Sequence, residues 1–163
     1  MRPILYLTTA TFFLMALTSS EGSAAEDVAL KIITMTRAAL DRWGKGDIQG
    51  PLELYDPGIT YFDPLQEKRV DGIEAMRKIY APIAGKLRIG HYEMIDPKVQ
   101  MYGEIAILTF NLIDDVIQAP SGPSNIRQPW NCTQVWAHKD GKWRVVHEHW
   151  SFIKPDPKTM PIP

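Results

Sequence analysis

The sequence predicts an α+β fold in which helices pack on one face of a curved antiparallel sheet. Helical periodicity is confined to the first half of the chain, and the second half holds four long strand-like runs separated by short turns. The pair Asp140-Gly141 lies between two of these runs, and Asp-Gly in that setting is a strong signal for a hairpin. Helices followed by a meander of strands are typical of this fold class.

The length allows one domain, and the composition is that of a globular chain rather than a disordered one. The 163 residues include 18 Lys+Arg and 19 Asp+Glu, which gives a formal net charge of −1, and 45% of the residues are hydrophobic. This near balance of charge argues against a dedicated nucleic-acid-binding protein, which needs a surplus of basic residues. The single cysteine, Cys132, excludes an internal disulfide and any metal site built from several thiolates, and its strand-like surroundings favour a buried thiol.

Residues 1–25 are expected to be a signal peptide. Arg2 precedes an apolar run at residues 4–17, and Ser23-Ala24-Ala25 provides the small residues of a cleavage site. The alternative is an uncleaved membrane anchor, although no basic cluster follows the apolar run. We therefore expect a periplasmic or secreted protein without membrane contact after cleavage, with a domain at residues 26–153 and an extended Pro-rich tail at residues 154–163.

The expected elements of the mature chain follow from periodicity and from turn residues. Three helices are predicted at residues 26–43, 47–55 and 72–84. A turn at Asp56-Pro57-Gly58 leads into a short strand at residues 59–63. Four long strands are predicted at residues 87–101, 104–118, 126–138 and 142–153.

This order of elements resembles the nuclear transport factor 2-like superfamily, which includes the ketosteroid isomerases and polyketide cyclases. Three stretches are more specifically similar to the association (hub) domain of calcium/calmodulin-dependent protein kinase II. They are Phe62-Asp63-Pro64 with Val70-Asp71-Gly72; His91 through Asp96-Pro97 to Gly103-Glu104; and Thr133-Gln134-Val135-Trp136 with Asp140-Gly141-Lys142-Trp143 and Val146-His147-Glu148-His149. The resemblance covers roughly residues 28–153.

The resemblance implies a cone-shaped α+β fold, in which a strongly bent antiparallel sheet wraps three N-terminal helices and leaves a pocket at its open end. It also implies a homodimer or a higher homo-oligomer formed through the outer face of the sheet. It does not imply regulation of a kinase, because no kinase domain is present in this sequence.

The pocket of the hub domain binds small carboxylates through cationic side chains, and this chain departs from that pattern. The matched positions hold Met76, Asn111, Gln134 and Trp150. Without cations, the pocket lacks charge-assisted hydrogen bonds to a carboxylate. We therefore expect a small, largely uncharged organic ligand that contacts these residues together with Tyr80, His91 and Trp136.

Alternation along the last strand gives it two faces. Arg144, Val146, Glu148 and Trp150 share one face, and the resemblance places this face toward the pocket; a β-bulge would invert the assignment locally. Glu148 beside Trp150 is a candidate carboxyl with a raised pKa. The alternative is that Glu148 forms an ion pair with Arg144.

Acid–base chemistry of the isomerase, cyclase or dehydratase kind is the second hypothesis for function. Such chemistry needs a carboxylate base and a hydroxyl donor for the enolate oxygen. Asp63 or Glu148 could be the base, and Tyr61 or Tyr80 the donor. Asp63 also fits a turn residue before Pro64, and His91 fits either a general base or a polar strand residue.

Other functional classes have less support in the sequence. His147 and His149 place two imidazoles on one strand face, as two metal ligands would need; because the metal-free hub domain shares the pair, we expect structural or interface histidines and no metal. No nucleotide-binding or serine-hydrolase motif is present, and no cofactor is expected. A third hypothesis is an oligomerisation module without chemistry.

Overall fold

The computed structural model of the chain describes residues 15–120 and 124–154. The predicted tail beyond residue 154 and most of the apolar run of the predicted signal peptide lie outside the described residues. The elements in chain order are α1 (Met15–Trp43), α2 (Gln49–Leu52), β1 (Tyr55–Phe62), β2 (Val70–Asp71), α3 (Ile73–Tyr80), the 3-10 helix η1 (Ala81–Ile83), β3 (Arg88–Tyr102), β4 (Ile105–Gln118), β5 (Ile126–Lys139) and β6 (Lys142–Phe152).

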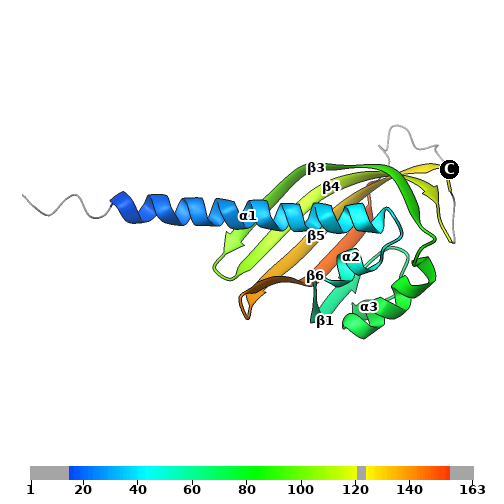
Figure 1. The fold of residues 1–163 in the computed structure, drawn as a ribbon, viewed down its shortest axis with the longest axis horizontal. Helices are drawn as coiled ribbons and strands as arrows, with labels where there is room; N and C mark the ends of the chain where they lie inside the picture. The colour runs from blue at the N-terminus through cyan, green and yellow to red at the C-terminus, as the bar shows by residue number, and fades with distance from the viewer. Residues whose placement is uncertain (1–14, 121–123, 155–163) are drawn as a thin grey trace, which may run out of the picture.

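The six strands form one curved sheet in the order β2-β1-β6-β5-β4-β3. The pairs β3/β4, β4/β5, β5/β6 and β1/β2 are antiparallel, whereas β1 and β6 are parallel. Figure 1 shows α1 lying across one face of the sheet, with α2 and α3 near β1. The predicted α+β class, with helices on one face of a bent sheet, is confirmed.

The first helix extends further toward the N-terminus than predicted. We expected it to begin at Glu26, but α1 begins at Met15 and includes Ser23-Ala24-Ala25. Within the described residues, no helix is both long enough and apolar enough to cross a bilayer.

The second and third helices are shorter than predicted. The second ends at Leu52, because the backbone at Leu54 already accepts a hydrogen bond from the amide of Val145 at 2.9 Å, and Tyr55 pairs with Val145 in the sheet. The predicted turn at Asp56-Pro57-Gly58 is therefore an irregularity inside β1 and does not precede the strand. The third helix narrows to η1 at Pro82, which has no amide hydrogen to continue an α-helix.

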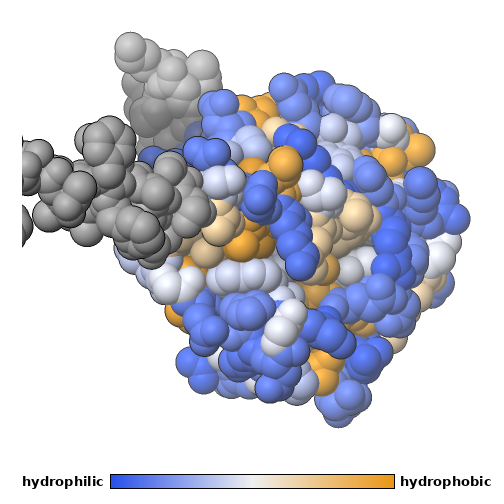
Figure 2. Space-filling model, turned by 60° about the vertical axis from the view of Figure 1, so that its left-hand side comes forward, coloured by the Kyte–Doolittle hydropathy of each residue, from blue (hydrophilic) through white to orange (hydrophobic). Residues whose placement is uncertain are grey.

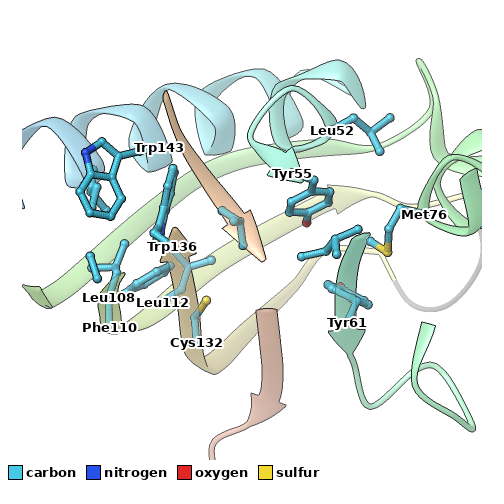
Figure 3. Packing of buried hydrophobic residues seen from close by; sticks show 14 of the residues in the cluster. Leu52, Tyr55, Tyr61, Met76, Leu108, Phe110, Leu112, Cys132, Trp136 and Trp143 are labelled. Carbon is cyan, nitrogen blue, oxygen red and sulfur yellow. The ribbon is translucent and has the colours of Figure 1, made fainter. Parts of the chain in front are cut away.

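The core fills the space between the helices and the inner face of the sheet. Ile32, Ile59, Met76, Leu108, Trp136 and Val145 are fully buried there. Figure 3 shows Tyr55 and Tyr61 near Met76, while Leu108, Phe110, Cys132 and Trp136 occupy another part of the same core. Cys132 is a buried free thiol, as predicted. On the face shown in Figure 2, hydrophobic residues form separate patches bordered by hydrophilic ones.

Candidate functional site

A cavity of about 310 Å³ lies between the helices and the inner face of the sheet. Its walls come from α1, β1, α3 and the long strands, and most of its lining is apolar. The aromatic residues in the lining include Trp43, Tyr55, Tyr61, Tyr80, Trp130 and Trp150. An apolar cavity with a few polar groups is the usual form of a small-molecule site.

Glu148 lies on β6 and is a buried carboxyl of this cavity, with 3% of its surface exposed. Its Oε2 accepts a hydrogen bond from the hydroxyl of Tyr55, and its Oε1 lies 2.5 Å from the donating Nε2 of Gln134. The hydroxyls of Tyr55 and Tyr80 are 3.1 Å apart. A chain of polar groups therefore runs from α3 through β1 to β6 and β5.

The surroundings of Glu148 change its proton affinity and that of the nearby phenols. Burial raises the pKa of Glu148, although the hydrogen bonds from Tyr55 and Gln134 oppose that shift. Burial, followed by the charge of Glu148, raises the pKa of Tyr55 and of Tyr80. The phenols thus stay protonated as donors, and the predicted raised pKa of Glu148 is found.

Gln134 connects the carboxyl of Glu148 to α1. Its Oε1 accepts hydrogen bonds from Thr36 Oγ1 at 3.1 Å and from Trp136 Nε1 at 3.0 Å. With the donation to Glu148, the amide uses both ends, and this fixes its orientation. Gln134 and Thr36 are both almost fully buried, so this network holds the C-terminal half of α1 against the sheet.

Asp63 and Tyr61 are brought together at the end of β1, but they bind each other. The hydroxyl of Tyr61 donates to Asp63 Oδ2 at 2.9 Å, and the amide of Leu65 donates to Oδ1 at 2.6 Å. The bond from the amide of Leu65 is typical of a turn residue, which was the alternative role expected for Asp63. Both residues line the cavity, so a ligand would have to compete for the Tyr61 donor.

Asp114 is a second buried carboxyl that the sequence analysis did not single out. It lies on β4 with 6% of its surface exposed, lines the cavity, and accepts a hydrogen bond from Trp130 Nε1 at 3.3 Å. Burial, assisted by the charge of Asp115, raises the pKa of Asp114 to about 6. The alternation of β4 carried a signal, because Asp114 follows Phe110 and Leu112 on the inward face.

Four predicted ligand contacts lie elsewhere. Met76 and Trp136 are fully buried in the core and do not line the cavity. Asn111 is exposed on the opposite face of the sheet, where its Nδ2 donates to Asn131 Oδ1 at 2.8 Å. His91 is exposed on β3, in register with Asp115. Of the predicted ligand-binding set, Tyr80, Gln134 and Trp150 line the cavity.

A β-bulge in β6 changes which residues face inward. Val135 pairs with His147 and Trp136 pairs with Val145, so Val146 is the extra residue. Trp143 and Val145 are therefore buried on the same side as Glu148, whereas strict alternation placed them opposite it. Arg144 donates to the backbone oxygen of Glu53, so it forms no ion pair with Glu148.

His147 and His149 lie on the outer face, as the resemblance to the hub domain implied. The ring of Phe62 packs against both imidazoles, with centroids 6.0 and 5.8 Å apart, and His147 Nδ1 is 2.8 Å from Thr60 Oγ1. Burial, followed by the neighbouring His149, lowers the pKa of His147. Among the described side chains, no group of three His, Cys, Asp or Glu residues is arranged to hold a metal ion.

The charge of the cavity lining is one-sided. Asp63, Asp114 and Glu148 all contribute carboxyl groups, and none of the described residues that line the cavity is Lys, Arg or His. An anion placed here would meet carboxylates without a compensating cation, which is electrostatically unfavourable. The positions matched to the hub domain hold no cation, and no other described lining residue supplies one.

Comparisons with known proteins agree with this architecture. The family model of the calcium/calmodulin-dependent protein kinase II association domain matches residues 29–154. The delta subunit of that kinase from Oryctolagus cuniculus is 27% identical over a match of 140 residues that covers 81% of this chain. The chain spans only 26% of that kinase.

Solved structures give the same result. A protein from Parabacteroides distasonis named as a candidate ketosteroid isomerase is 35% identical, with a TM-score of 0.62, and the match covers 76% of this chain and 86% of that one. The association domain of the C. elegans kinase is 24% identical, with a TM-score of 0.61, and the match covers 81% and 98%. By its match over most of its length, the chain belongs to the calcium/calmodulin-dependent protein kinase II association domain family, within the nuclear transport factor 2-like fold.

Proposed function

We propose that the chain binds a small organic molecule with a largely uncharged body in the cavity beside Glu148. The observation that supports this most strongly is the lining of the 310 Å³ cavity, where aromatic and aliphatic side chains surround a few hydrogen-bonding groups. Flat aromatic walls offer a large apolar contact area. Gln134 and Tyr80 provide polar groups that could orient a ligand.

Ligand-dependent thermal stability tests this proposal. Probes are neutral polycyclic alcohols and ketones, including 2-naphthalenemethanol and progesterone, with 2-naphthoate as the anionic match. A ligand at about 100 times its Kd adds about 2.7 kcal/mol to the free energy of unfolding. We expect at least one neutral probe to raise the melting temperature and 2-naphthoate to leave it unchanged.

A matched pair of variants places the binding in the cavity. Ala39 is buried and lines the cavity from α1, whereas its neighbour Ala38 is exposed. Ala39→Leu should weaken binding of the neutral probe because the added carbons occupy the cavity, and Ala38→Leu should not. If no probe binds, or if binding survives Ala39→Leu unchanged, the proposal is wrong.

A second candidate function is proton transfer by Glu148, and the raised pKa of that buried carboxyl favours it. A base with a raised pKa removes a proton next to a carbonyl more readily, and the hydroxyl of Tyr80 could stabilise the enolate oxygen. Isomerisation of a β,γ-unsaturated ketosteroid is a direct assay. Activity that is lost in Glu148→Gln and retained in Glu93→Gln, an exposed control on β3, supports catalysis by Glu148. Loss in Asp63→Asn alone would assign the base to Asp63.

We also propose that the chain forms a homodimer or a higher homo-oligomer through the outer sheet face. Membership of an association-domain family supports this, and the exposed ring of Phe62 lies on that face between His147 and His149. Light scattering should give a mass that is a multiple of one chain, and Phe62→Glu should reduce it. A monomeric mass for the unsubstituted chain contradicts the proposal, whereas an oligomer with no measurable ligand favours a pure assembly module.

Export remains a proposal, drawn from the predicted signal peptide. Cleavage after Ala25 would remove the beginning of α1 and leave Glu26 as the new N-terminus. Expression in a bacterium, followed by fractionation and N-terminal mass determination, tests this. Recovery from the periplasm or medium with Glu26 first is expected, and an intact N-terminus in the membrane fraction would support the anchor alternative.

A further inference from the structure

We propose that the molecule taken into the cavity carries a protonated amine, which Asp114 binds while the apolar body lies against Trp130 and Trp150. This inference rests on the proposed binding function and specifies the chemical class of the ligand. It follows from three features of the cavity: the one-sided charge of its lining, the free hydrogen-bonding capacity of Asp114, and the indole of Trp130 bonded to that carboxyl with Trp150 beside it.

The three carboxyls of the lining differ in how far they are already satisfied. Both oxygens of Glu148 accept hydrogen bonds, from Tyr55 and Gln134, and both oxygens of Asp63 accept bonds at the end of β1. From other side chains Asp114 accepts one bond, the long 3.3 Å bond from Trp130 to Oδ1, and its own backbone amide also favours the ionised carboxyl. Among the side-chain hydrogen bonds and ion pairs of the described residues, Oδ2 of Asp114 accepts none. This oxygen is the acceptor that a ligand can use.

The position of Asp114 makes a cationic partner more favourable than a neutral one. Asp114 is 94% removed from solvent, and in the sheet it lies opposite Tyr92 of β3 and Gln128 of β5, neither of which is basic. A neutral donor supplies a hydrogen bond but leaves the buried charge in place. An ammonium group supplies a hydrogen bond and also neutralises the charge, which matters most where water is excluded.

The aromatic residues Trp130 and Trp150 also favour a cationic ligand over a neutral one. Trp130 donates to the carboxyl, and its ring meets that of Trp150 edge to face, with centroids 6.0 Å apart. Indole faces attract cations and also bury flat apolar groups. Because Asp63, Asp114 and Glu148 do not form a cluster able to hold a metal ion, an organic cation fits this charge better than a metal does.

Three probes of matched shape test the inference: 2-naphthylmethylamine, 2-naphthalenemethanol and 2-naphthoate. Calorimetric titration of the full chain at pH 7.5 should show the amine binding about tenfold more tightly than the alcohol, with no measurable binding of the carboxylate. Asp114→Asn should reduce amine affinity to that of the alcohol and leave alcohol affinity unchanged. Asp115→Asn is the matched control, because Asp115 adjoins Asp114 but lies near Arg127, and it should change neither affinity.

The results can contradict the amine assignment without contradicting the proposed binding in the cavity. Equal affinity for amine and alcohol, or an equal loss for both in Asp114→Asn, overturns the amine assignment while leaving binding in the cavity intact. Binding of the carboxylate as tightly as the amine also overturns it. If none of the three probes nor progesterone binds, both the proposed function and this inference are wrong.

Discussion

Gln134 Nε2 lies 2.5 Å from Glu148 Oε1, so an amide on β5 and a carboxyl on β6 are paired in a water-excluded interior. The same amide accepts from Thr36 and Trp136. One side chain therefore links a helix to two strands at the cavity. Buried networks of this kind are stabilising only while every member is satisfied.

Replacement of Gln134 by Leu should destabilise the fold. The substitution leaves the indole of Trp136 and one oxygen of Glu148 without their partners, and each unsatisfied buried group costs about 1 to 3 kcal/mol. We expect the free energy of unfolding, measured in urea, to fall by about 2 to 4 kcal/mol. Thr36→Val is the milder comparison, expected to cost about 1 kcal/mol. Equal effects of the two substitutions would show that Gln134 is not the centre of the network.

Two substitutions of Glu148 should show whether the fold depends on the volume and hydrogen bonds of this side chain or on its charge. Glu148→Ala removes the acceptors of Tyr55 and Gln134 and opens a void, so a loss of about 2 to 4 kcal/mol is expected. Glu148→Gln keeps the volume of the side chain. The new amide NH₂ can donate to the hydroxyl of Tyr55, provided that this hydroxyl turns its own proton toward Tyr80. Chemical denaturation should rank Gln close to the parent and Ala far below it; the reverse order contradicts the network.

Asp114 should make stability depend on pH in the direction opposite to an ion-paired carboxyl. Its pKa is about 6 in the folded chain and 3.8 for an aspartate free in water, so the folded state binds the proton more tightly. Stability therefore decreases as the pH rises from about 4 through 6. Asp114→Asn should raise the free energy of unfolding by about 3 kcal/mol at pH 7.5 and change little at pH 4. A gain of the same size at both values would contradict a buried charge.

Gly50 should be sensitive to the addition of a single methyl group. A Cβ at this position would lie 2.7 Å from the backbone oxygen of Ala39 and 2.8 Å from Cβ of Arg42, so α2 would have to move away from α1. Gly50→Ala is expected to cost about 1 to 3 kcal/mol. At Gly58 the nearest atom is the carboxyl oxygen of Asp56 at 3.3 Å, so thermal denaturation should show a smaller loss for Gly58→Ala.

The repetitive parts of the fold could be predicted from the sequence because their signals are local. The four long strands were expected within a few residues of β3 to β6, since alternation and the Asp-Gly turn depend only on neighbouring residues. Tyr55 was assigned to a helix because its strand partner, Val145, lies ninety residues later. Pairing between strands so far apart in the chain cannot be detected from the hydrophobic pattern of neighbouring residues.

The candidate site was predictable in part. The inward direction of Glu148 and Gln134 followed from the family resemblance, and both line the cavity. Asn111 faces away because β4 places Phe110 and Leu112 inward, so the residue between them must point outward. Trp143 was placed on the wrong face, because the bulge at Val146 that turns it inward has no sequence signature.

The parallel pairing of β1 with β6 has a consequence for how the protein reaches its final form. Tyr55 and Tyr61 come from the first strand, and Glu148 comes from the last. Glu148 accepts the hydrogen bond of Tyr55 and lies in register with Tyr61. The binding chamber is thus completed by segments that leave the ribosome at opposite ends of translation, and contacts so distant in sequence form slowly. A chain truncated before β6 would retain the β3–β5 meander but would have no chamber.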